Sequence, residues 1–366
     1  MRPARRLALL LLGLLVLPLS VDAGEVNPTD APGDADAADD GAAEGADAAE
    51  VPPAVPAPVA PPVPEGPSDE LLAYIKAIAE VPIEDRGPFL WRVQSKKKKH
   101  KGVAVLYGSI HLGKTDMYPL PTEVEAAFAA ADRLAVEMDL SDPEMEARMG
   151  QELLTIGRLP EGQTIKDLLP ERYEELKTGL WRMGIPMVFM ENMTPFMIGM
   201  TYTVVEMTRA GWNPELGIDK YFLNKARAQG KTIVELEGLE RQLAVFREMP
   251  MAAQLSMLKS TLDMAGATDA WTQRAWAALL AGDDRALLRL SDLEDSDTEE
   301  YDAYEEVLLG DRNVEMAAKI AEHIETGDDV MFVVVGALHL PGDDGLVALL
   351  GKNKKFKVAR LPRAAE

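Results

Sequence analysis

The chain has 366 residues, no cysteine and a net charge of −23 at pH 7. The lack of cysteine excludes disulfides and thiol nucleophiles, and a domain of this size can build a stable core without such cross-links. The acidic balance disfavours nucleic acid as a partner, because an acid-rich surface repels phosphate backbones.

The first 66 residues predict two segments ahead of the folded domain. Residues 1–23 combine three arginines, an apolar run and a small residue before Gly24, which is typical of a cleaved secretory signal peptide. The alternative is an uncleaved anchor, but the apolar run is short for a membrane span. We therefore expect an exported protein, periplasmic or extracellular, with no membrane span after cleavage. Residues 24–66 contain ten acidic side chains and no lysine or arginine, which predicts a disordered linker before a domain at 67–366.

The domain is predicted to open with a helix and a β-hairpin. Helical spacing of apolar residues runs from Ser68, the expected cap, to Ala79. Two β-rich runs at 89–94 and 102–107 flank a cluster of five lysines and His100, which we interpret as a solvated hairpin loop. A helix capped by Thr122 and a buried strand at 134–138 follow.

Two long helical stretches come next, at about 142–228 and 239–325, separated by a strand at 232–236. Their methionines are interpreted as core filling. A strand at 330–335, a short helix at 345–350 and a strand at 356–361 complete the chain. This order predicts an α/β fold, with a central, mostly parallel sheet, an N-terminal β-hairpin and a large helical insertion.

Two histidines follow buried strands after the same Gly-x-x spacer. Gly108 precedes His111, and Gly336 precedes His339. Ligands of open α/β sheets bind outside the carboxyl ends of the strands, so we expect both histidines in one crevice. Glycine allows a sharp turn or a close approach, which makes Gly108 and Gly336 candidate cofactor-binding positions. Taken singly, each histidine could instead be a hydrogen-bonded core residue.

Acidic residues follow the two intervening strands. A carboxylate buried at Glu137 needs a cation, a metal or a proton. Asp139 could share its role, and either Glu235 or Glu237 could face inward. The structural alternative is a salt bridge to Arg312 or another core arginine.

Two histidines with one or two carboxylates and an open position form the ligand set of a catalytic divalent metal. The predicted ligands are His111, His339 and Glu137, and zinc, manganese, cobalt or iron would suit them. A bound metal would activate water and polarise a carbonyl, which is hydrolytic chemistry. The sequence contains neither a His-Glu-x-x-His motif nor a Gly-x-Ser-x-Gly elbow.

The ordered series of these motifs resembles the TraB/GumN family, to which the animal TIKI proteins also belong. The resemblance spans about residues 89–361. It rests on the segments 106–113, 119–133, 136–139, 217–219, 237–242, 312–313 and 335–342.

This resemblance implies a fold related to the erythromycin-esterase and ChaN-like superfamily. In the TIKI branch it implies proteolysis that depends on manganese or cobalt, with a peptide or protein as substrate. His111 and His339 would then be metal ligands or catalytic histidines, and Glu137 a ligand or base. Glu237 and Arg312 would be supporting residues.

Three hypotheses follow for the function. The first is an exported metal-dependent hydrolase, specifically a peptidase. The second is a non-catalytic protein of the ChaN-like type, which holds haem or another ligand in the same crevice. The third is an interaction protein with a degenerate site, against which the intact set of histidines and glutamates argues.

Overall fold

The computed structural model describes residues 68–293, 304 and 306–363. The signal peptide expected at 1–23 and the linker expected at 24–66 lie outside these residues and stay predictions. Within the described ranges, no helix is both long enough and apolar enough to cross a membrane.

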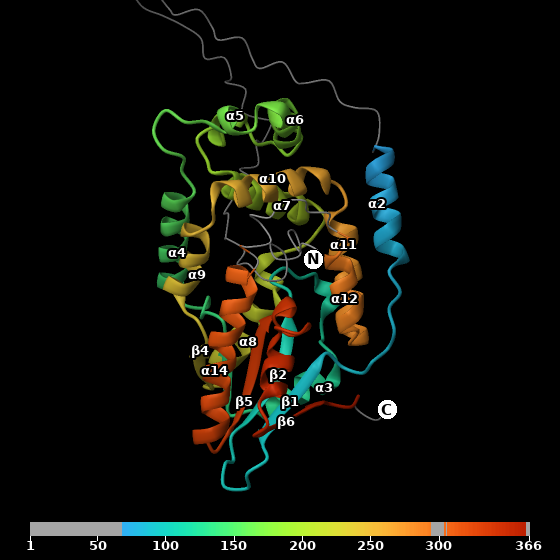
Figure 1. The fold of residues 1–366 in the computed structure, drawn as a ribbon, viewed down its shortest axis with the longest axis vertical. Helices are drawn as coiled ribbons and strands as arrows, with labels where there is room; N and C mark the ends of the chain where they lie inside the picture. Colours follow the sequence, from blue (N-terminus) through green and yellow to red (C-terminus); the bar gives the residue numbers. More distant parts are fainter. Residues whose placement is uncertain (1–67, 294–303, 305, 364–366) are drawn as a thin grey trace, which may run out of the picture. The chain divides into compact units, whose positions relative to one another are not determined.

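The six predicted strands form one mixed sheet (Figure 1). They are β1 (Leu90–Ser95), β2 (Val103–Ser109), β3 (Arg133–Val136), β4 (Thr232–Glu235), β5 (Val330–Gly336) and β6 (Phe356–Arg360). Their order across the sheet is β4-β3-β5-β2-β1-β6. The first four in this order pair in parallel, and β1 is antiparallel to both of its neighbours. The predicted α/β fold with a mostly parallel sheet is therefore confirmed.

Strands β2 and β5 lie at the centre of the sheet because they are apolar on both faces. All of β2 is buried, and so is all of β5 after Val330. Such burial is typical of parallel strands that helices cover on both sides. The register pairs Gly108 with Val335 and Ser109 with Gly336, so the two Gly-x-x-His segments leave the sheet side by side.

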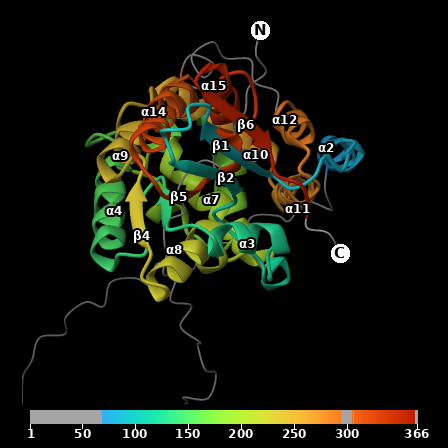
Figure 2. The same cartoon turned by 90° about the horizontal axis from the view of Figure 1, so that it is seen from below.

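Helices cover both faces of the sheet (Figure 2). One face carries α14 (Asp311–Thr326) and α15 (Leu346–Lys352), and the other carries α3 (Thr122–Ala129) and α8 (Ile218–Ala228). Aromatic packing holds the second layer in place. The ring centroids of Phe128 in α3 and Phe222 in α8 are 4.9 Å apart, and they lie 5.7 Å and 5.0 Å from the ring of Phe332 in β5.

Helical segments interrupt the connections on both sides of β4, as predicted. Between β3 and β4 lie α4 (Pro143–Ile156), α5 (Ile165–Leu168), α6 (Tyr173–Arg182), α7 (Pro195–Arg209) and α8. Between β4 and β5 lie α9 (Leu239–Arg247), α10 (Met251–Asp263), α11 (Thr268–Ala281), α12 (Asp284–Ser291), a π-helical turn (Glu306–Gly310) and α14. Helices of the two segments pack against one another, α7 against α10 and α4 against α9.

Of the two helix caps predicted from the sequence, one is confirmed and one is wrong. Ser68 caps α2 (Asp69–Glu80), and its hydroxyl accepts the N–H of Leu71 at 3.1 Å. The cap predicted at Thr122 is wrong, because Pro121 occupies the N-cap position of α3 and no side chain caps this helix. Proline fixes its own backbone angle, so the chain enters this helix without a side-chain cap.

The β1–β2 hairpin confirms the predicted connection. Its loop, residues 96–102, carries the lysine cluster and lies at the bottom of Figure 1. Strand β2 starts beside this loop and ends two residues before His111. A seven-residue strand at about 3.3 Å per residue separates the two edges by roughly 20 Å.

Candidate active site

The site lies at the carboxyl-terminal edge of the three parallel strands β3, β5 and β2. His111 follows β2, Glu137 follows β3, and His339 ends a 3-10 turn (Ala337–His339) that follows β5. Since these strands are neighbours in the sheet, their ends bring the three side chains to one place. All three residues are buried.

Arg312 lies at the centre of a buried ion-pair cluster. This residue of α14 is fully buried, and its Nη2 donates to Glu137 Oε2 at 2.7 Å and to Glu237 Oε2 at 2.8 Å. Its Nε donates to Glu237 Oε1 at 2.7 Å, and its Nη1 to the carbonyl of Leu308 at 3.0 Å. The salt bridge raised as an alternative from the sequence is therefore present, and one arginine pairs with two buried carboxylates.

Other donors complete the surroundings of Glu137. The backbone N–H of Gly336 donates to Oε1 at 2.7 Å. The side-chain amide of Gln242 donates to Glu137 Oε2 at 3.0 Å and to Glu237 Oε2 at 2.5 Å. With both carboxylate oxygens engaged, Glu137 is held in one orientation, and the end of β5 is tied to the end of β3.

His339 is held through its Nδ1, 2.6 Å from Asn313 Oδ1. The Asn313 amide donates to the carbonyl of Asp344 at 2.9 Å, which directs Oδ1 toward the imidazole and assigns the proton to Nδ1. The other nitrogen, Nε2, lies 3.7 Å from Glu137 Oε1 and is buried without a hydrogen-bond partner. Burial, followed by the positive charge of Arg312, holds the pKa of His339 well below its usual value.

His111 is held by a carboxylate instead. Its Nδ1 lies 2.7 Å from Asp219 Oδ2, and the hydroxyl of Ser109 donates to Asp219 Oδ1 at 2.6 Å. Its Nε2 is also buried without a hydrogen-bond partner. Burial alone would lower the pKa of His111, but the charge and hydrogen bond of Asp219, with a smaller effect of Glu137, outweigh it and raise the pKa. The positive charge of His111 in turn lowers the pKa of His339, so the two imidazoles interact.

Asp219 reaches His111 because the start of α8 packs directly on the loop after β2. The N–H of Ile218 donates to the carbonyl of Ile110 at 3.0 Å. A Cβ on Gly217 would lie 2.3 Å from the carbonyl oxygen of His111, so a larger residue does not fit there. This contact fixes the position of the carboxylate relative to the imidazole.

Gly108 and Gly336, the two glycines predicted as cofactor-binding, both make contacts within the fold. A Cβ on Gly108 would meet the Phe89 ring at 2.7 Å and the Cα of Ala337 at 3.0 Å. Gly108 thus permits close packing between Phe89, the residue before β1, and the turn after β5, while Gly336 supplies the N–H that holds Glu137.

Two acids that the sequence offered as alternatives face elsewhere. Asp139 pairs with Arg227 at 2.8 Å and accepts hydrogen bonds from Ser141. Glu235 accepts the backbone N–H of Asp139 at 2.8 Å. The alternating geometry that would turn Asp139 inward does not apply, because β3 ends at Val136. Of the second pair, Glu237 is the inward residue.

Three residues of the site received no role from the sequence: Asp219, Asn313 and Gln242. All three lie on helices, and each belongs to a segment that carries the family resemblance. Their contribution is to orient His111, His339 and Glu137, respectively.

The described part of the chain contains no group of three or more His, Cys, Asp or Glu side chains arranged to hold a metal ion. The site offers two nitrogen atoms without a hydrogen-bond partner to a metal or a substrate, His111 Nε2 and His339 Nε2. Glu137 Oε1 lies beside His339 Nε2.

The fold and the site define an α/β protein with a buried His-Glu-Arg cluster at one edge of its sheet. Residues 89–360, from the hairpin to the last strand, match the TraB/PrgY/gumN family, and the chain belongs to this family. The resemblance predicted from the sequence motifs is thereby confirmed.

Two relatives are similar over most of their length. The uncharacterized protein YbaP of Escherichia coli (strain K12) is 29% identical over 246 residues, which cover 67% of this chain and 86% of the relative. The protein of the same description from Shigella flexneri matches with the same values. No solved structure matches the chain.

Proposed function

We propose that this protein is a metal-dependent hydrolase that acts on a peptide or protein substrate and uses His111 and His339. One observation carries the proposal: both imidazoles are buried with Nδ1 held and Nε2 without a partner. Metal-binding histidines share this arrangement, because an acceptor at one nitrogen fixes the tautomer and leaves the other lone pair for the metal.

The donor set fits manganese, cobalt or zinc, all of which accept imidazole nitrogen. His111 and His339 would hold the ion, and Glu137 is the carboxylate beside them. When bound, the ion supplies a water of lowered pKa and polarises the carbonyl of the substrate.

The remaining residues have roles that follow from their contacts. Asp219 and Asn313 keep the Nε2 atoms of the two histidines directed at the site. Glu137 Oε1, 3.7 Å from His339 Nε2, is positioned to accept a proton beside that nitrogen. Arg312 pairs with both Glu137 and Glu237 and offsets one of their two charges, which helps to keep Glu137 buried beside the reacting groups.

The proposal is tested by calorimetric titration of the purified protein with Mn²⁺, Co²⁺ and Zn²⁺. We expect about one ion per chain, and we expect its binding to be lost in the double variant His111→Ala, His339→Ala. The matched control is His100→Ala, His323→Ala, which removes the other two histidines and leaves binding intact. Unchanged binding in the first variant would end the metal proposal.

Catalysis is tested separately, with a peptide library and the protein loaded with Mn²⁺ or stripped with a chelator. Metal-dependent cleavage that the double variant lacks is the expected result. If the protein instead gives a Soret band on titration with haem and cleaves nothing, the ligand-binding alternative replaces the hydrolase.

We further propose that the protein is exported to the periplasm or the exterior. The charged start, apolar run and small residue of residues 1–23 support this location. Fractionation of expressing cells, with sequencing of the mature amino terminus, tests it. We expect a mature chain that begins at Gly24, whereas a full-length cytoplasmic chain contradicts export.

A further inference from the structure

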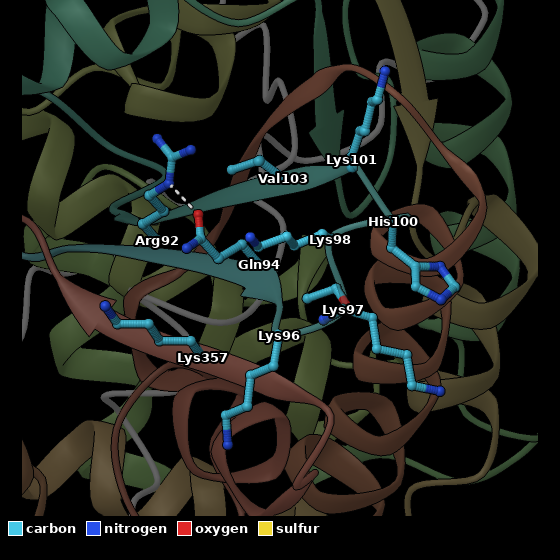
Figure 3. Close-up of a pocket in the computed structure, with 11 residues that line it drawn as sticks. Arg92, Gln94, Lys96, Lys97, Lys98, His100, Lys101, Val103 and Lys357 are labelled. Atoms are coloured by element: carbon cyan, nitrogen blue, oxygen red, sulfur yellow. Dashed lines mark hydrogen bonds between the residues drawn. The ribbon is translucent and has the colours of Figure 1, made fainter.

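A basic pocket lies at the sheet edge opposite to the histidines. It has a volume of about 530 Å³ and is formed by the loop 96–102 with the adjacent ends of β1, β2 and β6 (Figure 3). Its basic residues are Arg92, Lys96, Lys97, Lys98, His100, Lys101 and Lys357. The other lining residues are Gln94, Ser95, Gly102 and Val103, so the pocket lining includes no carboxylate.

The pocket lysines form no direct ion pairs with the described acids. Glu325 pairs with Lys355, and this hydrogen bond, with smaller effects of the charges of Lys355, His100 and Lys97, lowers its pKa. Lys97, Lys98, Lys101 and Lys357 are exposed, and their ammonium groups form no ion pair with the described residues. Acids are abundant elsewhere, since the chain has 61 Asp and Glu against 38 Lys and Arg. The positive charges of these lysines repel one another. An anion bound among them would reduce this repulsion and so lower the free energy of the folded protein.

The loop that carries these lysines is tied to its surroundings on two sides. Toward β6, the N–H of Lys96 donates to the carbonyl of Lys355 at 2.8 Å. Toward α14, His100 Nδ1 hydrogen-bonds to the carbonyl of Glu325. These two hydrogen bonds fix the position of the loop relative to β6 and α14.

Gly102 brings the loop against the end of α14. A Cβ at this position would lie 2.3 Å from the carbonyl oxygen of His323, so only glycine permits the approach. The wall of the pocket is therefore fixed by backbone contacts, while the lysine side chains extend from it (Figure 3).

The lining also limits the chemistry of a ligand. It contains no Phe, Tyr or Trp ring on which a nucleic-acid base could stack, and its one imidazole, that of His100, is held by the carbonyl of Glu325. Val103 is its one large apolar residue, too little for an acyl chain. What remains is recognition by charge and by hydrogen bonds from ammonium groups, which bind phosphate as point charges. A concave site with several lysines favours a compact anion with more than one negative charge.

We propose that this pocket binds a compact anion that carries two or more phosphate charges. Such a group can come from a free oligophosphate or from the headgroups of an anionic membrane. The site is distinct from the proposed hydrolase centre, because the length of β2 separates the two edges.

Binding is tested on the full chain with inorganic tripolyphosphate by calorimetry, and with vesicles of phosphatidylcholine with or without phosphatidylglycerol by co-sedimentation. We expect saturable binding to tripolyphosphate that weakens with added salt. The triple variant Lys97→Gln, Lys98→Gln, Lys101→Gln is expected to bind at least about tenfold more weakly, since each lysine near an anionic group contributes severalfold. Because these side chains are exposed, the variant retains the fold, which its circular dichroism will verify.

A matched pair within the loop separates the pocket from a diffuse charge effect. Lys98 and Lys99 are adjacent and both exposed, but Lys98 lines the pocket and Lys99 does not. Lys98→Gln should therefore weaken binding more than Lys99→Gln. Equal losses of affinity in the two variants would overturn the proposal that the pocket binds the anion.

The two probes identify the source of the phosphate. Binding to tripolyphosphate alone supports a free oligophosphate, and binding to both probes supports a membrane headgroup. Failure to bind either probe overturns the proposal. So does tight binding to duplex DNA that tripolyphosphate does not displace, because the partner would then be a nucleic acid.

Discussion

The two edges of this sheet differ in whether their charged side chains are buried and paired or exposed and unpaired. At the carboxyl-terminal edge, Arg312, Glu137 and Glu237 are buried and paired with one another. At the other edge, the loop 96–102 exposes lysines that have no acidic partner among the described residues. A buried charge requires a partner, whereas water solvates an exposed one. Removal of one charge should therefore cost much at the first edge and little at the second.

The largest expected effect is at Arg312. Substitution Arg312→Met leaves two carboxylates buried without their cation, and we expect the free energy of unfolding to fall by about 3–5 kcal/mol. Urea denaturation measures this change. The control is Arg241→Gln, which breaks a partly exposed pair with Glu315 and should cost no more than about 1 kcal/mol. Equal losses would erase the contrast between buried and exposed charges.

The next effect concerns the packing that positions Asp219. In Gly217→Ala the added methyl group meets the carbonyl of His111, and we expect a loss of about 1–3 kcal/mol in the free energy of unfolding. A methyl group added at Gly150 in α4 would have no neighbouring atom within 4 Å, so Gly150→Ala should instead stabilise by about 0.5–1 kcal/mol. Thermal and urea unfolding of the two variants checks the signs. A neutral Gly217→Ala would show that α8 is free to move away from His111.

A smaller effect separates the two histidines by pH. In the metal-free protein, His111 should titrate above the usual value of about 6.5, and His339 should stay neutral well below it. Nuclear magnetic resonance of labelled imidazoles follows both. Asp219→Asn removes the largest interaction that favours the charged form of His111, so its midpoint should fall.

The control for this titration is Asp139→Asn. Asp139 pairs with Arg227, away from the histidines, and its substitution should leave the His111 midpoint in place. Equal shifts in the two aspartate variants would mean that His111 responds to overall charge and not to its hydrogen-bonded partner.

The smallest effect is expected at the lysine edge. Lys98→Gln and Lys99→Gln should each change the free energy of unfolding by no more than about 0.5 kcal/mol, because exposed side chains without partners contribute little. Denaturation in urea at low salt is the measurement. A loss of several kcal/mol in either variant would show that the loop supports the fold and is not only a surface for binding.

The strands and the residues that follow them were predictable because the evidence is local. Apolar runs mark β2, β3 and β5, and His111, Glu137 and His339 stand within three residues of the ends of these strands in the sequence. The order of the strands was not predictable, since β5 lies between β2 and β3 only in three dimensions.

The orienting residues were not predictable for the same reason. Asp219 is 108 residues from His111, and no local pattern links a helix start to a distant histidine. Asp139 was misjudged because the two-residue alternation of a strand stops where β3 stops. The pairing of Glu137 and Glu237 with Arg312 could be raised only as an alternative, because the sequence does not place α14 over the end of the sheet.

The position of β5 in the sheet has a consequence for biosynthesis. Because β2 and β3 contact one another through β5, a growing polypeptide holds the β1–β2 hairpin and the β3–β4 pair as separate halves. These halves join when residues 330–336 have been made, close to the end of translation. Pairings over such long sequence separations form late and slowly. A nascent chain that stops before β5 therefore has neither a continuous sheet nor the second histidine, and the site can assemble only in the completed polypeptide.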